Sequence, residues 1–186
     1  MVCAAGRDKE RSWEFEFDFF AVELEIHFEV ASFRTEADYG KDRKPQEVSH
    51  TSEIREDAAR RDFTVGGLYF DPINKKIIDY VGGLKDIDER VLRTIGDPYE
   101  RLVVEDPLRM LRYIRFLSKY NLKFDREIKE VIKDNVEALH NLPAERFKGE
   151  NGELDKMLKL PRSAFAVSQL ARVGALKEIL PEVYEL

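Results

Sequence analysis

Hydrophobic and acidic residues alternate over residues 13–33, and this pattern predicts β-structure at the start of the chain. The inward-facing parity switches between Phe19 and Val22. Because side chains alternate between the two faces of a strand, a switch of parity requires a bulge or a tight reversal at this point. No Gly, Pro or Asn marks a turn there, and one uninterrupted strand of this length would be unusual.

The next part of the chain mixes polar and apolar segments. Residues 35–50 are polar and predict a loop. Ser52 predicts the N-cap of a helix that runs to about Arg61. Short apolar runs at 68–70 and 77–80 flank turn residues and predict a β-hairpin.

Beyond Gly82-Gly83 the apolar residues recur at helical spacing. Asp106 predicts the cap of a helix with Pro107 in its first turn, where the missing N–H of proline is not needed. Helices are expected at 106–120, from Asp125 to about Leu139, around 154–158, at 163–173 and at 176–180. Strands followed by helices predict an α+β fold.

Composition and charge narrow the class of protein. The 186 residues include 43% hydrophobic and 37% charged residues, which is typical of a globular chain. The net charge of -6 gives no general support for nucleic-acid binding, so any such binding needs a local basic face. The chain has one cysteine, no apolar run of membrane length and no signal-peptide pattern, so we expect a cytoplasmic protein without a membrane partner.

The segment Glu105-Asp106-Pro107-Leu108-Arg109 is the first candidate for chemistry. Asp106 and Arg109 are about one helical turn apart, so they can present a paired acceptor and donor to a nucleobase. Arg112 and Arg115 continue the series along a face separate from the apolar stripe, and guanidinium forks suit phosphate. The alternative is a capped helix with surface salt bridges of little energetic weight. The apolar stripe itself comprises Leu108, Leu111, Ile114 and Leu117.

Two further groups of charged residues precede that helix. Arg60, Arg61 and Asp62 can grip phosphate and ribose, or they can simply complement the C-terminal end of a helix. Glu16 and Asp18 point to one face of a strand, as two metal-binding carboxylates must. The alternative for this pair is the solvated side of an amphipathic strand.

Several segments of the chain match the motifs of one known family, in the same order. They are Phe28–Glu36, Asp57 with Arg60–Val65, Ile78–Ile87, Leu92–Gly96, Glu105–Arg112 with Arg115-Phe116, Glu145-Arg146 and Lys156–Leu158. Taken together, these segments resemble the class II tRNA nucleotidyltransferases (CCA-adding enzymes) and the related bacterial poly(A) polymerases. The resemblance covers about residues 28–183.

The resemblance implies a nucleotidyltransferase head of the DNA polymerase β type, followed by a helical neck and body. We expect the head at 1–82, the neck with its base-reading helix at 83–142 and the start of an RNA-binding body at 143–186. The head is expected to be shortened, because Asp18 and Glu29 lie close together where the family has a longer stretch. Glu16 stands where the family's D-x-D metal motif has aspartate, so that motif is degraded.

The resemblance also implies roles for individual residues. Asp106 and Arg109 would read the Watson–Crick edge of incoming ATP or CTP, with Glu105 supporting Arg109. Arg60 and Arg61, together with Asp62, would hold the ribose and triphosphate. Asp79 and Asp86 would lie in a flexible segment between head and neck.

The resemblance further implies catalytic and RNA-binding residues. Glu16 and Asp18 would bind Mg²⁺, with Glu29 as a third catalytic carboxylate. Arg112 and Arg115 would contact RNA phosphate.

The implied activity is template-independent addition of AMP or CMP to an RNA 3′ end, either tRNA CCA addition or polyadenylation of another RNA such as mRNA. The alternative is a catalytically inactive module of the same family that binds a nucleotide or RNA.

Overall fold

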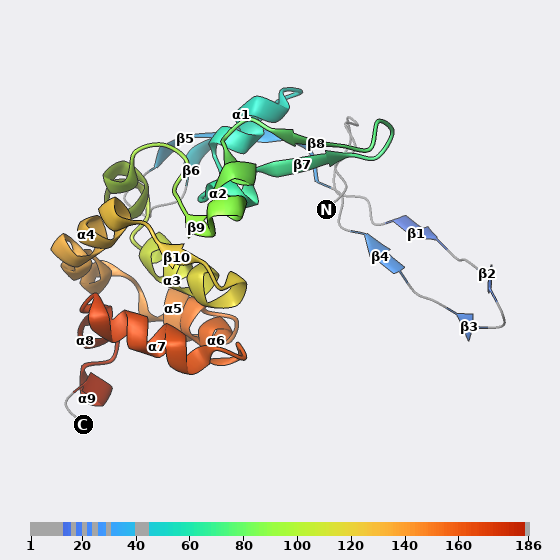
Figure 1. Cartoon of the computed structure of the whole chain (residues 1–186). Coiled ribbons are helices and arrows are strands. Elements are labelled where there is room, and N and C mark those ends of the chain that lie inside the picture. The colour runs from blue at the N-terminus through green and yellow to red at the C-terminus, as the bar shows by residue number, and fades with distance from the viewer. Residues whose placement is uncertain are drawn as a thin grey trace.

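The computed structural model describes the backbone at residues 13–15, 18–19, 22–23, 26–28, 31–39 and 45–184, and the side chains at 31–35 and 49–184. Figure 1 shows β-hairpins from the first part of the chain and a group of helices from the second part. This order of elements confirms the predicted α+β class. Within the described ranges, no helix is both long and apolar enough to cross a bilayer.

The alternating segment at the start of the chain forms short strands instead of one long strand. They are β1 (Trp13–Phe15), β2 (Asp18–Phe19), β3 (Val22–Glu23) and β4 (Ile26–Phe28). β1 pairs antiparallel with β4 and β2 with β3, and Phe19 stands opposite Val22. The chain reverses where the hydrophobic parity switches, so the predicted reversal is confirmed.

A second hairpin occupies the polar segment that was expected to be a loop. β5 (Arg34–Tyr39) pairs antiparallel with β6 (Pro45–His50). At its open end the Thr51 N–H donates to the Phe33 carbonyl at 3.0 Å. The loop prediction was wrong because it relied on the lack of a hydrophobic face, whereas strand pairing needs only backbone donors and acceptors.

Helix α1 (Ile54–Ala59) follows this hairpin, but Ser52 is not its cap. The N-cap position is Glu53, which makes no side-chain capping bond. The Glu53 N–H donates to Thr51 Oγ1 at 3.1 Å, so a threonine orders the chain before the helix. The next hairpin, β7 (Leu68–Asp71) with β8 (Lys76–Asp79), confirms the prediction for that segment.

The second half of the chain is helical, as predicted. Its elements are α2 (Gly83–Glu89), α3 (Leu108–Tyr120), α4 (Arg126–Asp134), α5 (Ala144–Lys148), α6 (Glu153–Leu158), α7 (Ser163–Arg172), α8 (Ala175–Ile179) and α9 (Pro181–Tyr184), with the short parallel strands β9 (Val91–Leu92) and β10 (Lys123–Phe124). Asp125 caps α4 by accepting the N–H groups of Glu127 and Ile128, which confirms that cap. α4 ends earlier than expected, and a 3-10 helix at Val136–Asn141 follows it.

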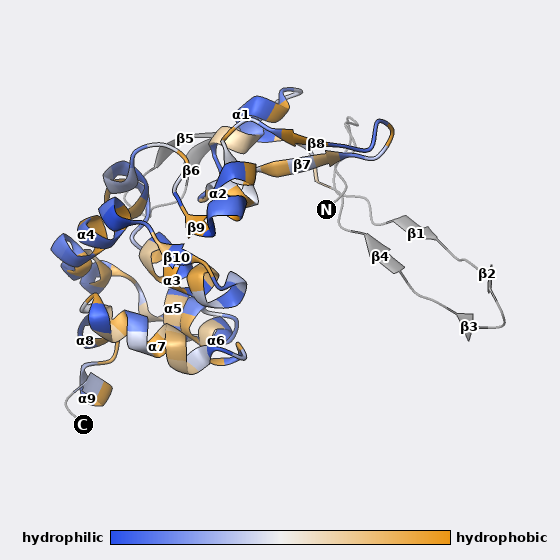
Figure 2. Cartoon of the chain, in the orientation of Figure 1, coloured by the Kyte–Doolittle hydropathy of each residue, from blue (hydrophilic) through white to orange (hydrophobic). Residues whose placement is uncertain are grey.

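Helix α3 lies in the main hydrophobic core. The predicted apolar stripe is buried, with exposures between 0% and 5%. Met110 and Tyr113 are buried as well, because α3 packs against α6 and α7 and also contacts β9. Figure 2 shows the hydrophobic residues along α3 and α7. Burial of each leucine or isoleucine stabilises the fold by about 1.5–3 kcal/mol relative to exposure.

A small second core comprises Phe33 before β5, Ala58 of α1 and Tyr69 of β7. Phe63 does not belong to this core, although it follows α1 closely. Its ring packs in the main core against Tyr113 and Phe116 of α3. This anchor holds the segment after α1 against α3, and so it determines where Asp62 lies.

Candidate functional site

Asp106 organises the first turn of α3. Its Oδ1 accepts the Leu108 N–H at 3.1 Å, and its carbonyl accepts the Arg109 N–H at 3.0 Å. Asp106 has extended backbone angles and ends a π-helical segment, Glu100–Glu105. The N-cap position of α3 is Pro107, one residue later than predicted, and Pro107 makes no side-chain capping bond. Asp106 still accepts a backbone N–H of the first turn, and this bond holds its carboxylate at the point where the two helical segments meet.

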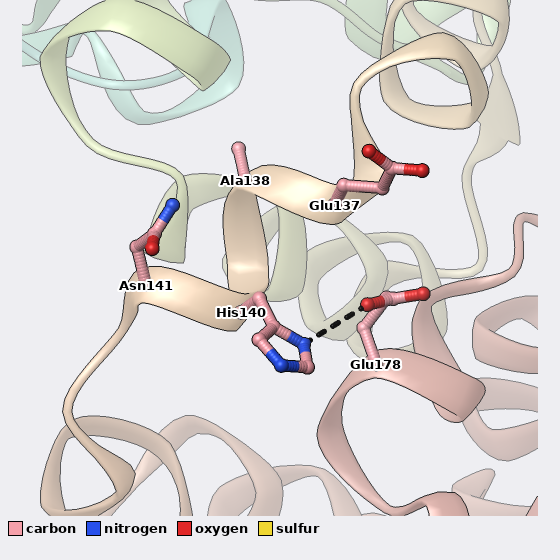
Figure 3. Close-up of a pocket in the computed structure, with 5 residues that line it drawn as sticks. All are labelled: Glu137, Ala138, His140, Asn141 and Glu178. Carbon is pink, nitrogen blue, oxygen red and sulfur yellow. Dashed lines mark hydrogen bonds and ion pairs between the residues drawn. The ribbon is translucent and has the colours of Figure 1, made fainter.

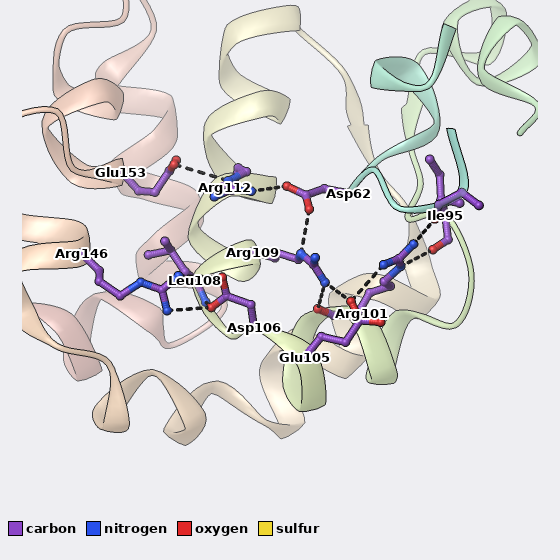
Figure 4. A network of polar contacts seen from close by, with 11 residues as sticks. Asp62, Ile95, Arg101, Glu105, Asp106, Leu108, Arg109, Arg112, Arg146 and Glu153 are labelled. Atoms are coloured by element: carbon purple, nitrogen blue, oxygen red, sulfur yellow. Dashed lines mark hydrogen bonds and ion pairs between the residues drawn. The ribbon is translucent and has the colours of Figure 1, made fainter. Parts of the chain in front are cut away.

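The Arg109 side chain lies off the apolar stripe, as expected, but it is buried by its ion-pair partners. It is 4% exposed. Its Nε contacts Asp62 Oδ1 at 2.7 Å, and its Nη1 contacts the Glu105 carboxylate. Nη1 also donates to the Arg101 carbonyl at 3.2 Å. Figure 4 shows these partners around the guanidinium, whose plane is fixed from two sides.

Asp106 has a partner that the sequence did not reveal. Arg146 of α5 donates to Asp106 Oδ2 at 2.8 Å and to Oδ1 at 3.2 Å, a bidentate contact (Figure 4). Asp106 itself is 6% exposed, so this contact neutralises a buried carboxylate. Glu145-Arg146 matched a family motif in the sequence, but nothing in its spacing indicated contact with a residue so far back in the chain.

Arg112 and Arg115 are bound to carboxylates of the chain itself. Arg112 contacts Asp62 and, through Nε at 3.4 Å, Glu153 Oε1. Arg115 Nε contacts Glu153 Oε2 at 2.6 Å. Glu153 is the second residue that sequence reasoning missed. Both arginines therefore face protein carboxylates in this structure, and their predicted contact with RNA phosphate remains a prediction.

Arg60 and Arg61 are held by one buried carboxylate. Asp57 is 1% exposed, and its oxygens lie 2.6 Å from Arg60 Nη2 and 2.9 Å from Arg61 Nη2. Burial alone would raise the pKa of Asp57, but the hydrogen bonds from Tyr69, from the Arg34 N–H and from the two arginines lower it to about 2. Burial and the bond to Asp57 raise the pKa of Tyr69 to about 12.

The two predicted nucleotide-binding groups meet at Asp62. This residue directly follows Arg60-Arg61, and its carboxylate contacts Arg109 and Arg112 of α3. The contact brings the segment after α1 to the first turn of α3. The resemblance predicts that these groups form one nucleotide site. The ion pairs of Asp62 bring the two segments together, and nucleotide binding there remains a prediction.

The predicted catalytic carboxylates cannot be placed in this site. Glu16 and Glu29 lie outside the described residues, and Asp18 lies in β2, where only the backbone is described. Among the side chains at 31–35 and 49–184, no group of three His, Cys, Asp or Glu residues could hold a metal ion. The predicted Mg²⁺ ligands Glu16 and Asp18 therefore remain a prediction.

The predicted flexible-segment residues Asp79 and Asp86 are both held by hydrogen bonds within the chain. Asp79 accepts the N–H groups at the start of α2, from Val81 to Leu84. Asp86 is 4% exposed and contacts Thr64 and Arg93. These contacts tie α2 to the segments on either side of it.

A separate hollow lies between α8 and the 3-10 helix Val136–Asn141 (Figure 3). His140 Nδ1 lies 3.2 Å from Glu178 Oε2 at its edge. None of the predicted site residues lines it.

Replacement of Arg146 by alanine is expected to lower the free energy of unfolding by about 1–3 kcal/mol, because it leaves the buried Asp106 carboxylate without its bidentate donor. Urea denaturation at pH 7 measures the change. Arg172→Ala, at an exposed position of α7, is the matched control and should change stability little. Equal losses in the two variants would contradict the structural importance of the Arg146–Asp106 pair.

Comparison with families of known proteins gives two matches along the chain. Residues 8–93 match the family described as "Poly A polymerase head domain". Residues 121–186 match the family described as "Probable RNA and SrmB- binding site of polymerase A". The region between the two matches contains the first turn of α3.

Curated relatives and solved structures agree with these matches. The CCA-adding enzyme of Bacillus licheniformis is 38% identical over 152 residues, which are 82% of this chain and 37% of that enzyme. The CCA-adding enzyme of Bacillus subtilis is 39% identical over 157 residues, which are 84% of this chain and 38% of that enzyme. The chain thus spans less than two-fifths of the length of these relatives. The crystal structure of the Bacillus stearothermophilus CCA-adding enzyme in complex with CTP superposes with a TM-score of 0.68 at 32% identity, covering 83% of this chain and 35% of that one.

Proposed function

The chain belongs to the family of CCA-adding enzymes and poly(A) polymerases, and from this membership we propose that it acts as an RNA nucleotidyltransferase. The substrates would be ATP or CTP and the 3′ end of an RNA, such as a tRNA. Relatives of known structure are described as complexes with CTP and with ATP. The observation that carries the proposal is the meeting of Asp106, Arg109 and the Arg60–Asp62 segment at one place.

The reaction is a phosphoryl transfer. The RNA 3′-hydroxyl oxygen forms a bond to the α-phosphorus, the bond from that phosphorus to the bridging oxygen of the β-phosphate breaks, and pyrophosphate leaves. The hydroxyl proton is released to a base or to water. Mg²⁺, when bound, would neutralise part of the negative charge of the phosphates. The described residues contribute recognition and orientation.

The pair Asp106 and Arg109 suits two of the four bases. Adenine and cytosine each present an amino donor beside a ring-nitrogen acceptor on the Watson–Crick edge, whereas guanine and uracil present a carbonyl acceptor beside an N–H donor. A carboxylate accepts only and a guanidinium donates only, so Asp106 with Arg109 complements adenine and cytosine. The ion pairs with Arg146, Asp62 and Glu105 hold both groups in fixed orientations, which favours discrimination between bases.

The arginines beside this pair supply positive charge for the phosphates. Arg60 and Arg61 are 18% and 24% exposed, and Asp57 orients both. Their guanidinium groups would contact the triphosphate and ribose. Arg112 and Arg115 lie further along α3, towards the part of the chain that matches an RNA-binding family, and would contact the RNA backbone.

Primer extension tests this proposal. The chain is incubated with an RNA primer, Mg²⁺ and one labelled nucleoside triphosphate at a time. We expect label from ATP or CTP in the primer and none from GTP or UTP. Asp106→Asn, which replaces one acceptor oxygen by an amide donor, should reduce the incorporation of the preferred nucleotide.

Two other outcomes are informative. Selective binding of ATP or CTP without any extension would identify a catalytically inactive nucleotide-binding module. If the chain neither binds a nucleotide nor extends the primer, a nucleotide site at Asp106 and Arg109 is refuted.

A further inference from the structure

Glu153 is a buried carboxylate to which the sequence assigned no role. It lies at the start of α6, is 4% exposed and accepts from two arginines of α3. A charged group in so little contact with water is stable only when it is paired. Arg115 lies closer to it than Arg112 does, at 2.6 Å against 3.4 Å.

The pairs of Glu153 continue to the base-reading arginine. The Arg112 guanidinium is shared between Glu153 and Asp62. Asp62 in turn uses Oδ2 for Arg112 and Oδ1 for Arg109 Nε, the latter at 2.7 Å. Negative and positive side chains therefore alternate along one series of ion pairs. The series runs in the order Glu153, Arg112, Asp62 and Arg109, as Figure 4 shows.

Each member of this series limits the position of the next. Burial would lower the pKa of the Arg112 guanidinium, but Asp62 and Glu153 raise it, so the arginine is charged and drawn towards both. Loss of the Glu153 charge leaves Asp62 as the main counter-charge of Arg112. Arg112 then competes more strongly with Arg109 for the Asp62 carboxylate, and the contact that orients the Arg109 guanidinium weakens.

We propose that Glu153 is a positioning residue for base selection, acting on Arg109 through Arg112 and Asp62. This inference rests on the proposed function, in which Arg109 donates to the ring nitrogen of adenine or cytosine. It adds that α6, remote in sequence from the base-reading turn, controls how strictly the base is selected. Glu153 itself touches no nucleotide in this scheme.

Nucleotide affinities of the whole chain and its Glu153→Gln variant test the inference. Calorimetry with ATP, CTP, GTP and UTP gives the ratio of affinities for the preferred and rejected nucleotides. We expect Glu153→Gln to lower this ratio by about threefold to tenfold, a size typical of coupling through a network. Glu150→Gln, at an exposed position before α6, is the matched control and should leave the ratio unchanged.

The ratio separates positioning from stability. A purely structural role would lower the melting temperature of Glu153→Gln but leave the ratio of affinities as in the wild type, and that result would overturn the inference. If Glu153→Gln does not fold, Arg112→Lys tests the same link, because an ammonium group cannot bridge two carboxylates as a guanidinium fork does. An unchanged ratio in that variant would also overturn it. A wild-type chain without preference for ATP or CTP would instead refute the proposed function.

Discussion

Arg109→Lys is expected to lower the affinity of the chain for ATP and CTP by roughly tenfold to a hundredfold. Lysine keeps the positive charge, but it lacks the planar fork that Asp62 and Glu105 hold from two sides. A hydrogen bond from a charged group contributes about 1.5–3 kcal/mol, and loss of that amount corresponds to the expected decrease. Calorimetric titration with each nucleotide measures it.

Lysine is the better test of recognition than alanine because Arg109 is buried. Arg109→Ala leaves the carboxylates of Asp62 and Glu105 without this partner, so it is also expected to reduce the free energy of unfolding. Arg172→Lys on the exposed surface of α7 controls for a general effect of the exchange. Identical affinities of the wild type and Arg109→Lys for ATP would refute the base-reading role.

The second large effect is expected at Asp57 of α1, which contacts Arg60, Arg61 and Tyr69. Asp57→Asn removes a buried charge from between two arginines, and breaking such a group is expected to destabilise the fold by about 3–5 kcal/mol. Because Arg60 and Arg61 lose their common anchor, we also expect weaker binding of triphosphate. Urea denaturation at pH 7 gives the first effect and titration with ATP the second.

The pH dependence of stability distinguishes this carboxylate from the others. The folded-state pKa of Asp57 is about 2, below its ordinary value of 3.8. Because the folded-state pKa is lowered, ionised Asp57 adds to the free energy of unfolding. This contribution is fully present above about pH 4 and is lost as the pH falls through 2. The difference between 3.8 and about 2 corresponds to roughly 2 kcal/mol. Denaturation curves from pH 2 to pH 7 should show this loss in the wild type.

The matched control is Asp88→Asn, at an exposed position of α2. Asp88→Asn should lose stability with falling pH as the wild type does, whereas Asp57→Asn should lack the part of this loss that comes from Asp57. Equal stability of Asp57→Asn and Asp88→Asn at pH 7 would show that the Asp57 group of contacts is not important for the fold.

The elements that were predicted correctly are those whose sequence patterns lie within a few neighbouring residues. The cap at Asp125, the hydrogen bond of Asp106 to the first turn of α3 and the hairpin β7–β8 follow from capping and turn chemistry within a few residues. The hairpin β5–β6 was missed because its strands lack an apolar face that could be read from the sequence. α4 was predicted too long because apolar spacing continues into the 3-10 helix after it.

The amino-acid sequence by itself determined the α+β class and the family resemblance, and it predicted Asp106 and Arg109 as a base-reading pair. Those conclusions depend on periodicity and on motifs that are contiguous in the chain. Only the tertiary structure decided how the charges are paired: Arg146 with Asp106, and Glu153 with Arg112 and Arg115. The physical reason is that a guanidinium binds whichever carboxylate the packing of helices brings within hydrogen-bonding distance, and sequence separation carries no information about that distance.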